Sequence, residues 1–326
     1  MKILITGGAG FIGSHLSEKL LKSGYEVSII DNLSTGSLLN LEKIKSSSKT
    51  EIHIDSIFNK KKMKELVQKC DQIYHLAAAV GVRLIVDKPV ETIETNILGT
   101  DILIKLANQF NKKIFIASTS EVYGKNDSLP FMENCNRIYG STNIRRWAYA
   151  ESKAIDEFLA LAYHYEKKLP VVIGRLFNTV GPRQSGQYGM VIPRFVQQAL
   201  LDHSLTVYGD GTQTRCFTHV YDSIEAMVGL MNNDNCIGEV YNIGSDQEIS
   251  ILELAKRVIS VTNSNSKIKL ISYSDAYEDG FEDMKRRVPD LSKLNNTIEF
   301  NPEFNIDNIL IQTYDYFKQY NIMEGI

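Results

Sequence analysis

A short apolar segment that runs straight into a glycine cluster constrains this chain more than any other feature. Residues 2–6 read KILIT, typical of a buried strand, and Gly7, Gly10 and Gly13 follow with the spacing GxxGxxG before a helical pattern over 14–21. Gly7 permits a tight bend, Gly10 lets backbone approach a pyrophosphate, and Gly13 lets the helix pack closely on the strand. The motif therefore predicts a strand–turn–helix unit that binds a dinucleotide.

The alternation of strand and helix continues along the chain. Apolar runs at 27–30, 51–55, 72–77, 113–118 and 171–177 alternate with helical patterns at 60–69, 90–110 and 149–167. Such connections are right-handed crossovers between parallel strands. We therefore expect an α/β fold with a doubly wound parallel (Rossmann) sheet in residues 1–178. After residue 178 the rhythm breaks, which indicates a smaller C-terminal α/β lobe over 179–326 with short strands at 205–209 and 239–243; some segments, such as 217–231, are expected to return to the main domain.

An acidic residue at the end of the second strand favours NAD over NADP. Asp31 lies eighteen residues past Gly13, where a carboxylate accepts hydrogen bonds from the adenosine ribose hydroxyls and repels a 2′-phosphate. Asp55 closes the third strand, where it either meets the adenine edge or caps its own loop. We expect NAD to be surrounded by Gly7, Gly10, Phe11, Ile12, Gly13, Asp31, Asn32, Ser34, Thr35, Gly36, Asp55, Leu76, Ala77, Ala78, Ser118, Tyr149 and Lys153.

Tyr149 and Lys153 form a candidate catalytic pair. They stand four residues apart in a segment with helical periodicity, so both project from one face. The lysine cation, together with a positive nicotinamide ring, would lower the pKa of the tyrosine and let its phenolate take a proton from a sugar hydroxyl. Thr119 directly follows the strand at 113–118, and the carboxyl ends of parallel strands form the ligand crevice. Its hydroxyl can therefore donate a hydrogen bond to the same sugar hydroxyl.

Charge and cysteine content exclude several other classes. With 36 Lys+Arg against 39 Asp+Glu the net charge is -3, so no global field favours nucleic acid or an anionic membrane. The four cysteines show no spacing typical of a disulfide framework or a zinc site, so no metal is expected. No stretch approaches the roughly 18 apolar residues that a membrane span needs. We expect a cytoplasmic protein.

These elements, in this order, resemble the extended short-chain dehydrogenase/reductase family, specifically its nucleotide-sugar branch. The resemblance covers nearly the whole chain and rests on TGGAGFIGSH at 6–15, HLAA at 75–78, YxxxK at 149–153, RLFNTVGPR at 175–183, VYGDGTQTR at 207–215 and RRVPDLSK at 286–293. It implies an NAD-dependent enzyme that transiently oxidises a nucleoside-diphosphate sugar at C4. The 4-keto sugar is then epimerised, dehydrated or decarboxylated.

The same resemblance implies a substrate site contributed mainly by residues 179–326. The stretch 189–193 is similar to the segment that faces uracil in the family, which suggests a UDP-sugar, and arginines suit the anionic diphosphate because of their planar fork. Arg183 and Arg194 are either further ligands or surface residues. The residues expected to bind substrate are Arg83, Asn178, Val191, Arg215 and Arg287.

The residues after Thr119 distinguish the possible reactions. Dehydratases of this family carry adjacent Asp and Glu here, but this chain has Ser120 in the Asp position, which disfavours dehydration. The 4-epimerases usually have a small or apolar residue where this chain has Glu121. Burying a carboxylate without a partner would cost several kcal/mol. The presence of Glu121 is therefore explained either by structural hydrogen bonds to backbone or by a role in the reaction.

Four regions resemble UDP-glucuronate decarboxylases: 119–124, 146–149, 215–218 and 277–287. In that chemistry the C4 ketone is β to the C6 carboxylate, so carbon dioxide leaves with its electrons delocalised into an enolate. The resemblance implies that Glu121 and Arg287 handle the carboxylate region and reprotonate C5, with Thr119, Ser120, Tyr149 and Lys153 completing the catalytic set. A UDP-sugar 4-epimerase remains the alternative, ahead of a 4,6-dehydratase or a non-catalytic NAD-binding regulator.

Two of the predicted helices, 90–110 and 149–167, carry apolar residues that fit either the sheet-facing core or an interface between two copies of the chain. Members of the family often dimerise through these helices in a four-helix contact. We therefore expect a homodimer, with an interface drawn from Ile97, Leu98, Leu103, Phe158, Leu161 and Ala162.

Overall fold

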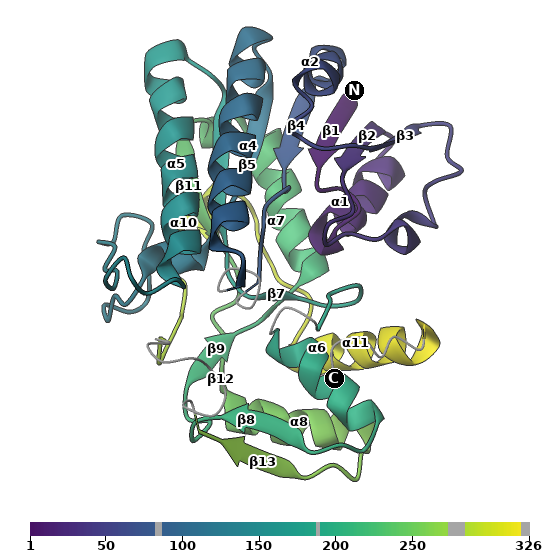
Figure 1. The fold of residues 1–326 in the computed structure, drawn as a ribbon, viewed down its shortest axis with the longest axis vertical. Helices are drawn as coiled ribbons and strands as arrows, with labels where there is room; N and C mark the ends of the chain where they lie inside the picture. Colours follow the sequence, from purple (N-terminus) through teal and green to yellow (C-terminus); the bar gives the residue numbers. More distant parts are fainter. Residues whose placement is uncertain (82–86, 187–189, 273–283, 321–326) are drawn as a thin grey trace.

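Within the residues that the computed structural model describes, 1–81, 87–186, 190–272 and 284–320, the largest element is a seven-stranded parallel sheet (Figure 1). The strand order is β11-β6-β5-β4-β1-β2-β3, which confirms the predicted doubly wound topology. The strands are β1 (Lys2–Thr6), β2 (Glu26–Asp31), β3 (Thr50–Ile54), β4 (Gln72–His75), β5 (Lys113–Thr119), β6 (Val171–Leu176) and β11 (Glu239–Ile243).

Helices cover both faces of this sheet because its strands are apolar on both sides. In β1, Ile3 and Ile5 face one core cluster whereas Leu4 faces the other, as the two-residue period of a strand requires. The first face is covered by α1 (Phe11–Lys22), α7 (Val220–Asn232) and α10 (Ser292–Thr297). The second face is covered by α2 (Lys60–Lys69), α4 (Pro89–Gln109) and α5 (Trp147–Lys167).

A smaller lobe lies beyond the carboxyl ends of the strands, in the lower part of Figure 1. Its own apolar core includes Phe195, Leu205 and Leu310. Among the described residues, its helices include α6 (Val191–Leu200), α8 (Ile251–Thr262) and α11 (Ile306–Tyr320). The short strands form the pairs β8 (Leu205–Tyr208) with β13 (Ile268–Ile271), β9 (Thr214–Cys216) with β12 (Glu248–Ser250), and β7 (Thr179–Val180) with β10 (Thr218–His219).

One predicted strand lies in a different place from the one expected. The segment 239–243 was assigned to the smaller lobe, but as β11 it pairs in parallel with β6 at the edge of the main sheet. The helix α7, which precedes it, packs in the core of the main sheet, as expected for a segment that returns. Alternating apolar residues predict a strand but do not say which sheet it joins.

Short 3₁₀ helices occupy Leu38–Leu41, Ser120–Tyr123 and Asp234–Cys236, labelled η1, η2 and η3. The cysteines at 70, 135, 216 and 236 are free thiols. Among the described residues, no helix is both long and apolar enough to cross a membrane.

Candidate active site

A cavity of about 800 Å³ lies at the carboxyl ends of the strands, between the main sheet and the smaller lobe. Ligands bind at this edge in doubly wound sheets. Of the predicted site residues, Arg83 lies outside the described residues, and Gly36 lies next to Ala9 and Asp31 but does not line the cavity. The cavity is lined by Gly7, Gly10, Phe11, Ile12, Gly13, Asp31, Asn32, Ser34, Thr35, Asp55, Leu76, Ala77, Ala78, Ser118, Thr119, Ser120, Glu121, Tyr149, Lys153, Asn178, Val191, Arg215 and Arg287.

In the glycine turn between β1 and α1, backbone segments pack too closely for a side chain to fit between them. Gly7 has a φ of 72°, and a Cβ there would lie 2.7 Å from the backbone nitrogen of Ala77. A Cβ on Gly13 would collide with the carbonyl oxygen of Gly7. Both positions therefore require glycine, and the resulting close approach of backbone at a helix N-terminus fits a pyrophosphate.

The carboxylate of Asp31 is fixed at the end of β2. Its Oδ2 accepts a hydrogen bond from the Ala9 amide at 2.9 Å, and its Oδ1 accepts one from the Leu33 amide at 2.8 Å. This leaves lone pairs on a carboxylate that lines the cavity, which fits a ribose with free hydroxyls. Asp55 also lines the cavity, but it caps its own loop through Ser56 and Asn59.

Tyr149 and Lys153, on the first turns of α5, line the cavity together with Thr119 at the end of β5. The hydroxyls of Tyr149 and Thr119 are hydrogen-bonded. Burial raises the pKa of Tyr149 above its usual value and the negative charge of Glu121 adds to the rise, whereas the hydrogen bond with Thr119 opposes it. Tyr149 therefore needs added positive charge before it can act as a base near neutral pH.

Glu121 lies between two arginines. Its Oε1 is 2.7 Å from Nη2 of Arg287 and its Oε2 is 3.4 Å from Nη2 of Arg146. Burial by itself raises the pKa of Glu121, but the two guanidinium groups outweigh it and lower that pKa to about 2. Nη1 of Arg287 is also 3.4 Å from Oγ of Ser120. The carboxylate that the sequence left unexplained thus belongs to a charged cluster on the cavity wall.

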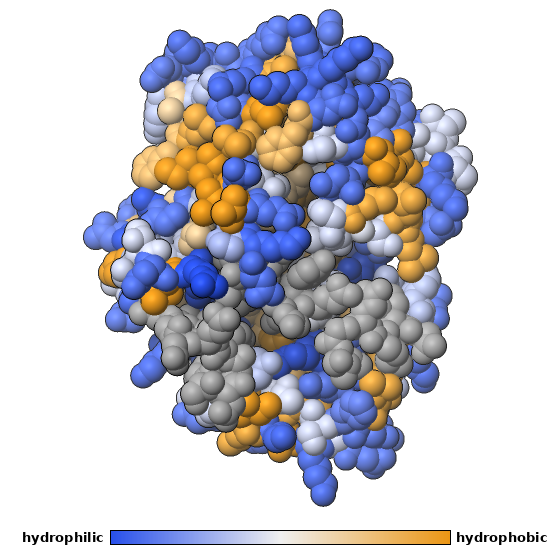
Figure 2. Space-filling view, in the orientation of Figure 1, coloured by the Kyte–Doolittle hydropathy of each residue, from blue (hydrophilic) through white to orange (hydrophobic). Residues whose placement is uncertain are grey.

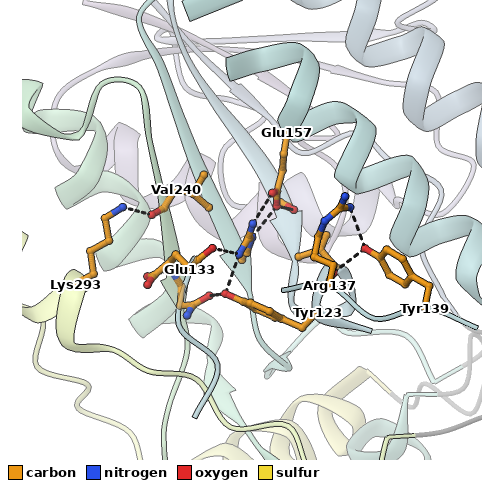
Figure 3. A network of polar contacts seen from close by, with 11 residues as sticks. Tyr123, Glu133, Arg137, Tyr139, Glu157, Val240 and Lys293 are labelled. Carbon is orange, nitrogen blue, oxygen red and sulfur yellow. Dashed lines mark hydrogen bonds and ion pairs between the residues drawn. The ribbon is translucent and has the colours of Figure 1, made fainter. Parts of the chain in front are cut away.

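A buried polar network supports the turn that carries Glu121 (Figure 3). Arg175 of β6 binds both carboxylate oxygens of Glu157 on α5, at 2.9 and 2.8 Å. Its Nη1 donates to the Tyr123 hydroxyl and to the carbonyl of Glu133, both at 2.9 Å. Tyr123 in turn donates to Oδ1 of Asn242 on β11. The network therefore joins η2, α5, β6 and β11 behind the catalytic residues.

The segment that follows Arg287 is anchored to this same network. The Phe131 amide donates to the carbonyl of Val288 at 2.8 Å, and the Asp290 amide donates to the carbonyl of Phe131 at 2.9 Å. The side-chain amide of Asn242 donates to the carbonyls of Phe131 and Asp290. These bonds explain how Arg287, which lies 166 positions after Glu121 in the chain, reaches the Glu121 carboxylate.

Asn178 and Arg215, two of the residues predicted to bind substrate, line the cavity. The Asn178 side chain donates to the carbonyl of Cys216, and Arg215 donates to the carbonyl of Thr214, so both are held in place by backbone. Arg183 is no surface residue, because its buried side chain binds Glu18 and Ser14 on α1. Arg194 lies over the ring of Tyr208, and both residues line the cavity.

Two charged residues near the pair Tyr149 and Lys153 received no role from the sequence. Arg146 lies one helical turn before Tyr149, and this spacing could have indicated a shared face. Asp156 lies three residues after Lys153, and its Oδ2 is 2.7 Å from Nζ. Such i,i+3 pairs usually lie on exposed faces, and only the packing of α5 against α4 shows that this one is buried.

Comparison with known proteins identifies the family. The family model described as GDP-mannose 4,6 dehydratase matches residues 4–313. The chain is 44% identical to the UDP-N-acetyl-alpha-D-glucosaminuronate decarboxylase of Bacillus cytotoxicus, with 98% of each chain covered. It is 35% identical to UDP-glucuronic acid decarboxylase 1 of Xenopus tropicalis, covering 98% of this chain and 72% of that protein.

A solved structure of UDP-glucuronic acid 4-epimerase from Bacillus cereus, in complex with UDP-glucuronic acid and NAD, superposes with a TM-score of 0.88. It is 34% identical, and the alignment covers 98% of this chain and all of that one. Its resemblance extends over the main sheet and the smaller lobe together. The chain therefore belongs to the GDP-mannose 4,6-dehydratase family of extended short-chain dehydrogenases/reductases.

Proposed function

We propose that this protein is an NAD-dependent decarboxylase of a UDP-linked uronic acid. The observation that carries the proposal is the cluster of Glu121, Arg287 and Arg146 beside Thr119 and Tyr149. The decarboxylases of Bacillus cytotoxicus and Xenopus tropicalis support the same reaction class. Within the chain, residues 1–178 are proposed to bind NAD and carry the catalytic pair, and residues 179–326 to contribute most of the sugar-nucleotide site.

The cofactor site is proposed to be the half of the cavity formed by the glycine turn and Asp31. Bound NAD supplies an acceptor for the hydride that leaves C4 of the sugar, and later returns it. Tyr149 takes the proton of the C4 hydroxyl in the first step and gives it back in the last, while Thr119 holds the same oxygen. Lys153 contributes positive charge that favours the phenolate form of Tyr149.

The charged cluster is proposed to receive the C6 carboxylate of the sugar. Two guanidinium groups and one carboxylate leave one net positive charge, which a uronate neutralises. Once C4 is a ketone, the C5–C6 bond breaks, its electron pair moves into the C4–C5 enolate, and neutral carbon dioxide leaves. Because the pKa of Glu121 is about 2, it carries no proton near neutrality. Its part in C5 protonation is therefore to orient a proton donor such as water.

A Glu121→Gln variant tests this role. We expect kcat to fall by about 10²-fold, the cost of misplacing a reacting group, while KM does not rise because repulsion of the substrate carboxylate is relieved. Steady-state decarboxylation rates would measure both constants. The matched control is Glu151→Gln, an exposed residue on α5. A raised KM with unchanged kcat would show that Glu121 only binds substrate.

The reaction itself is tested by incubating the protein and NAD with UDP-glucuronate, UDP-N-acetylglucosaminuronate and the corresponding neutral UDP-sugars. We expect a uronate to lose carbon dioxide, seen by mass spectrometry as a lighter UDP-sugar. The Bacillus cereus structure makes a 4-epimerase the second candidate. A product of unchanged mass and shifted chromatographic retention would establish that activity instead.

A homodimer is proposed through α4 and α5. Figure 2 shows apolar side chains gathered on this face of the molecule. Of the residues that fit an interface or the core, Leu98, Phe158 and Ala162 are exposed, whereas Leu103 belongs to the core because it is fully buried against the sheet. We expect sedimentation at micromolar concentration to give twice the chain mass and Phe158→Asp to give the monomer. A wild-type protein sedimenting as a monomer would contradict this.

A further inference from the structure

Lys153 and Asp156 form a buried ion pair in the interior of the protein. Nζ of Lys153 is 2.7 Å from Oδ2 of Asp156, and their side chains are only 3% and 0% exposed. Removing two charges from water is costly, and their mutual attraction often only balances that cost. Stability alone therefore gives no reason for this carboxylate at position 156.

Polar residues connect the surroundings of Asp156 to the main sheet. Burial raises the pKa of the Asp156 carboxyl group, whereas Lys153 and Thr100 on α4 oppose the rise, and Oγ1 of Thr100 is 3.0 Å from Nε2 of His75 on β4. Nδ1 of His75 is 2.7 Å from Oγ1 of Thr6 on β1. Burial lowers the pKa of His75 to about 3 and Lys153 contributes to this, so the ring is neutral and offers one donor and one acceptor. Of the two carboxylate oxygens of Asp156, Oδ2 is 2.7 Å from Nζ of Lys153, whereas Oδ1 has no hydrogen-bond partner among the described residues.

We propose that Asp156 is a positioning residue that holds the Lys153 ammonium group beside Tyr149 and offsets part of its charge. A lysine side chain is a flexible stem with many conformations. Holding it in one conformation before substrate binds lowers the conformational entropy that binding would otherwise cost. The ammonium group has three donors, of which Asp156 takes one and leaves two for ligands. Asp156 itself touches no substrate in this scheme and acts through Lys153.

The charges around Tyr149 determine whether the loss of the Asp156 charge raises or lowers the pKa of Tyr149. Glu121 and Asp156 both raise the pKa of Tyr149, in addition to burial, whereas Arg287 and the Thr119 hydrogen bond lower it. His75 is neutral near pH 7, and the Glu157 carboxylate beside Asp156 is paired with Arg175. Removing the charge of Asp156 while keeping Lys153 in place should therefore lower the pKa of Tyr149.

Asp156→Asn makes this change, because asparagine keeps the shape and a carbonyl oxygen that accepts from Nζ. Phenolate formation at Tyr149 would be followed in the NAD-loaded protein as the ultraviolet difference between each protein and its Tyr149→Phe counterpart. We expect the midpoint to fall by about one pH unit, the size of effect that a nearby charge produces. Glu151→Gln, on the exposed side of α5, should leave it unchanged. A midpoint equal to or above that of the wild type would overturn the proposal.

The positioning role is tested by Asp156→Ala, alone and combined with Lys153→Met. We expect Asp156→Ala to lower kcat about tenfold, as misplacement of a catalytic group does, and to cause no further loss when Lys153 is already methionine. An equal fold-loss in both backgrounds would show that Asp156 acts on the fold and not through Lys153. If the alanine variant does not fold, Asp156→Leu, which fills a similar volume without a polar atom, replaces it in the same cycle.

The proposal rests on the proposed function only in taking Tyr149 as the base. The titration needs no substrate, so its result stands even if no uronate loses carbon dioxide. Failure of the proposed function would appear in the product analysis with a normal titration shift. Failure of the present proposal would appear as an unshifted titration in a protein that decarboxylates.

Discussion

A Tyr149→Phe variant is expected to lose about 10³-fold in kcat, because it removes the hydroxyl that is proposed to exchange the C4 proton. The variant keeps the aromatic ring, and phenylalanine in the same buried place should leave the fold and the NAD site intact. Product formation from the preferred UDP-uronate gives kcat, and a fluorescence titration with NAD gives the dissociation constant.

The matched control is Tyr165→Phe, which changes an exposed tyrosine on the same helix. It should keep wild-type turnover. If Tyr149→Phe retained most of its activity while binding NAD normally, Tyr149 would not be the base. Indifference to this substitution is also what a non-catalytic NAD-binding regulator would show. Loss of NAD binding along with activity would instead assign Tyr149 to cofactor binding.

The second large effect concerns stability. Arg175→Leu is expected to lower the free energy of unfolding by about 3–5 kcal/mol, because it leaves the Glu157 carboxylate buried without its partner. Arg175 and Glu157 are each 6% exposed, so solvent cannot replace the lost interaction. The Tyr123 hydroxyl and the carbonyl of Glu133 lose a donor at the same time. Denaturant unfolding followed by circular dichroism would measure the change.

Two controls separate burial from charge. Arg257→Leu breaks the Arg257–Asp307 pair at the surface, which should leave the unfolding midpoint nearly unchanged. Glu157→Leu combined with Arg175→Leu removes both buried charges and should recover part of the loss. An Arg175→Leu protein that unfolds at the wild-type denaturant concentration would contradict a supporting role for the network.

The predicted site residues whose positions follow directly from the sequence are separated by short spacings. The glycine turn, Asp31 and the Tyr149–Lys153 pair follow from residues that are neighbours on one turn, helix or strand end, where local geometry determines direction. Glu121 and Arg287 were associated only through a family resemblance, because 166 residues separate them and their contact depends on how Phe131 and Asn242 hold the later segment.

Other features were not predictable because they depend on tertiary packing. Whether Asp156 faces water or α4 is decided by the position of α5 on the sheet, and the sequence shows only an acidic residue three positions after a lysine. The same reason explains Leu103, since an apolar residue on α4 fits an interface and a core equally well until the helix is oriented. The placement of 239–243 required knowledge of which strand edge was free.

The position of β11 also has a consequence for how this chain is made. The sheet edge at β6 is completed by a strand that leaves the ribosome only after α6, β8 and β9 of the smaller lobe have been synthesised. A nascent chain ending before residue 239 therefore exposes the hydrogen-bonding groups of β6 along one edge, the kind of edge that promotes association with other chains. During translation, the main sheet therefore gains its last strand only after part of the smaller lobe has been synthesised.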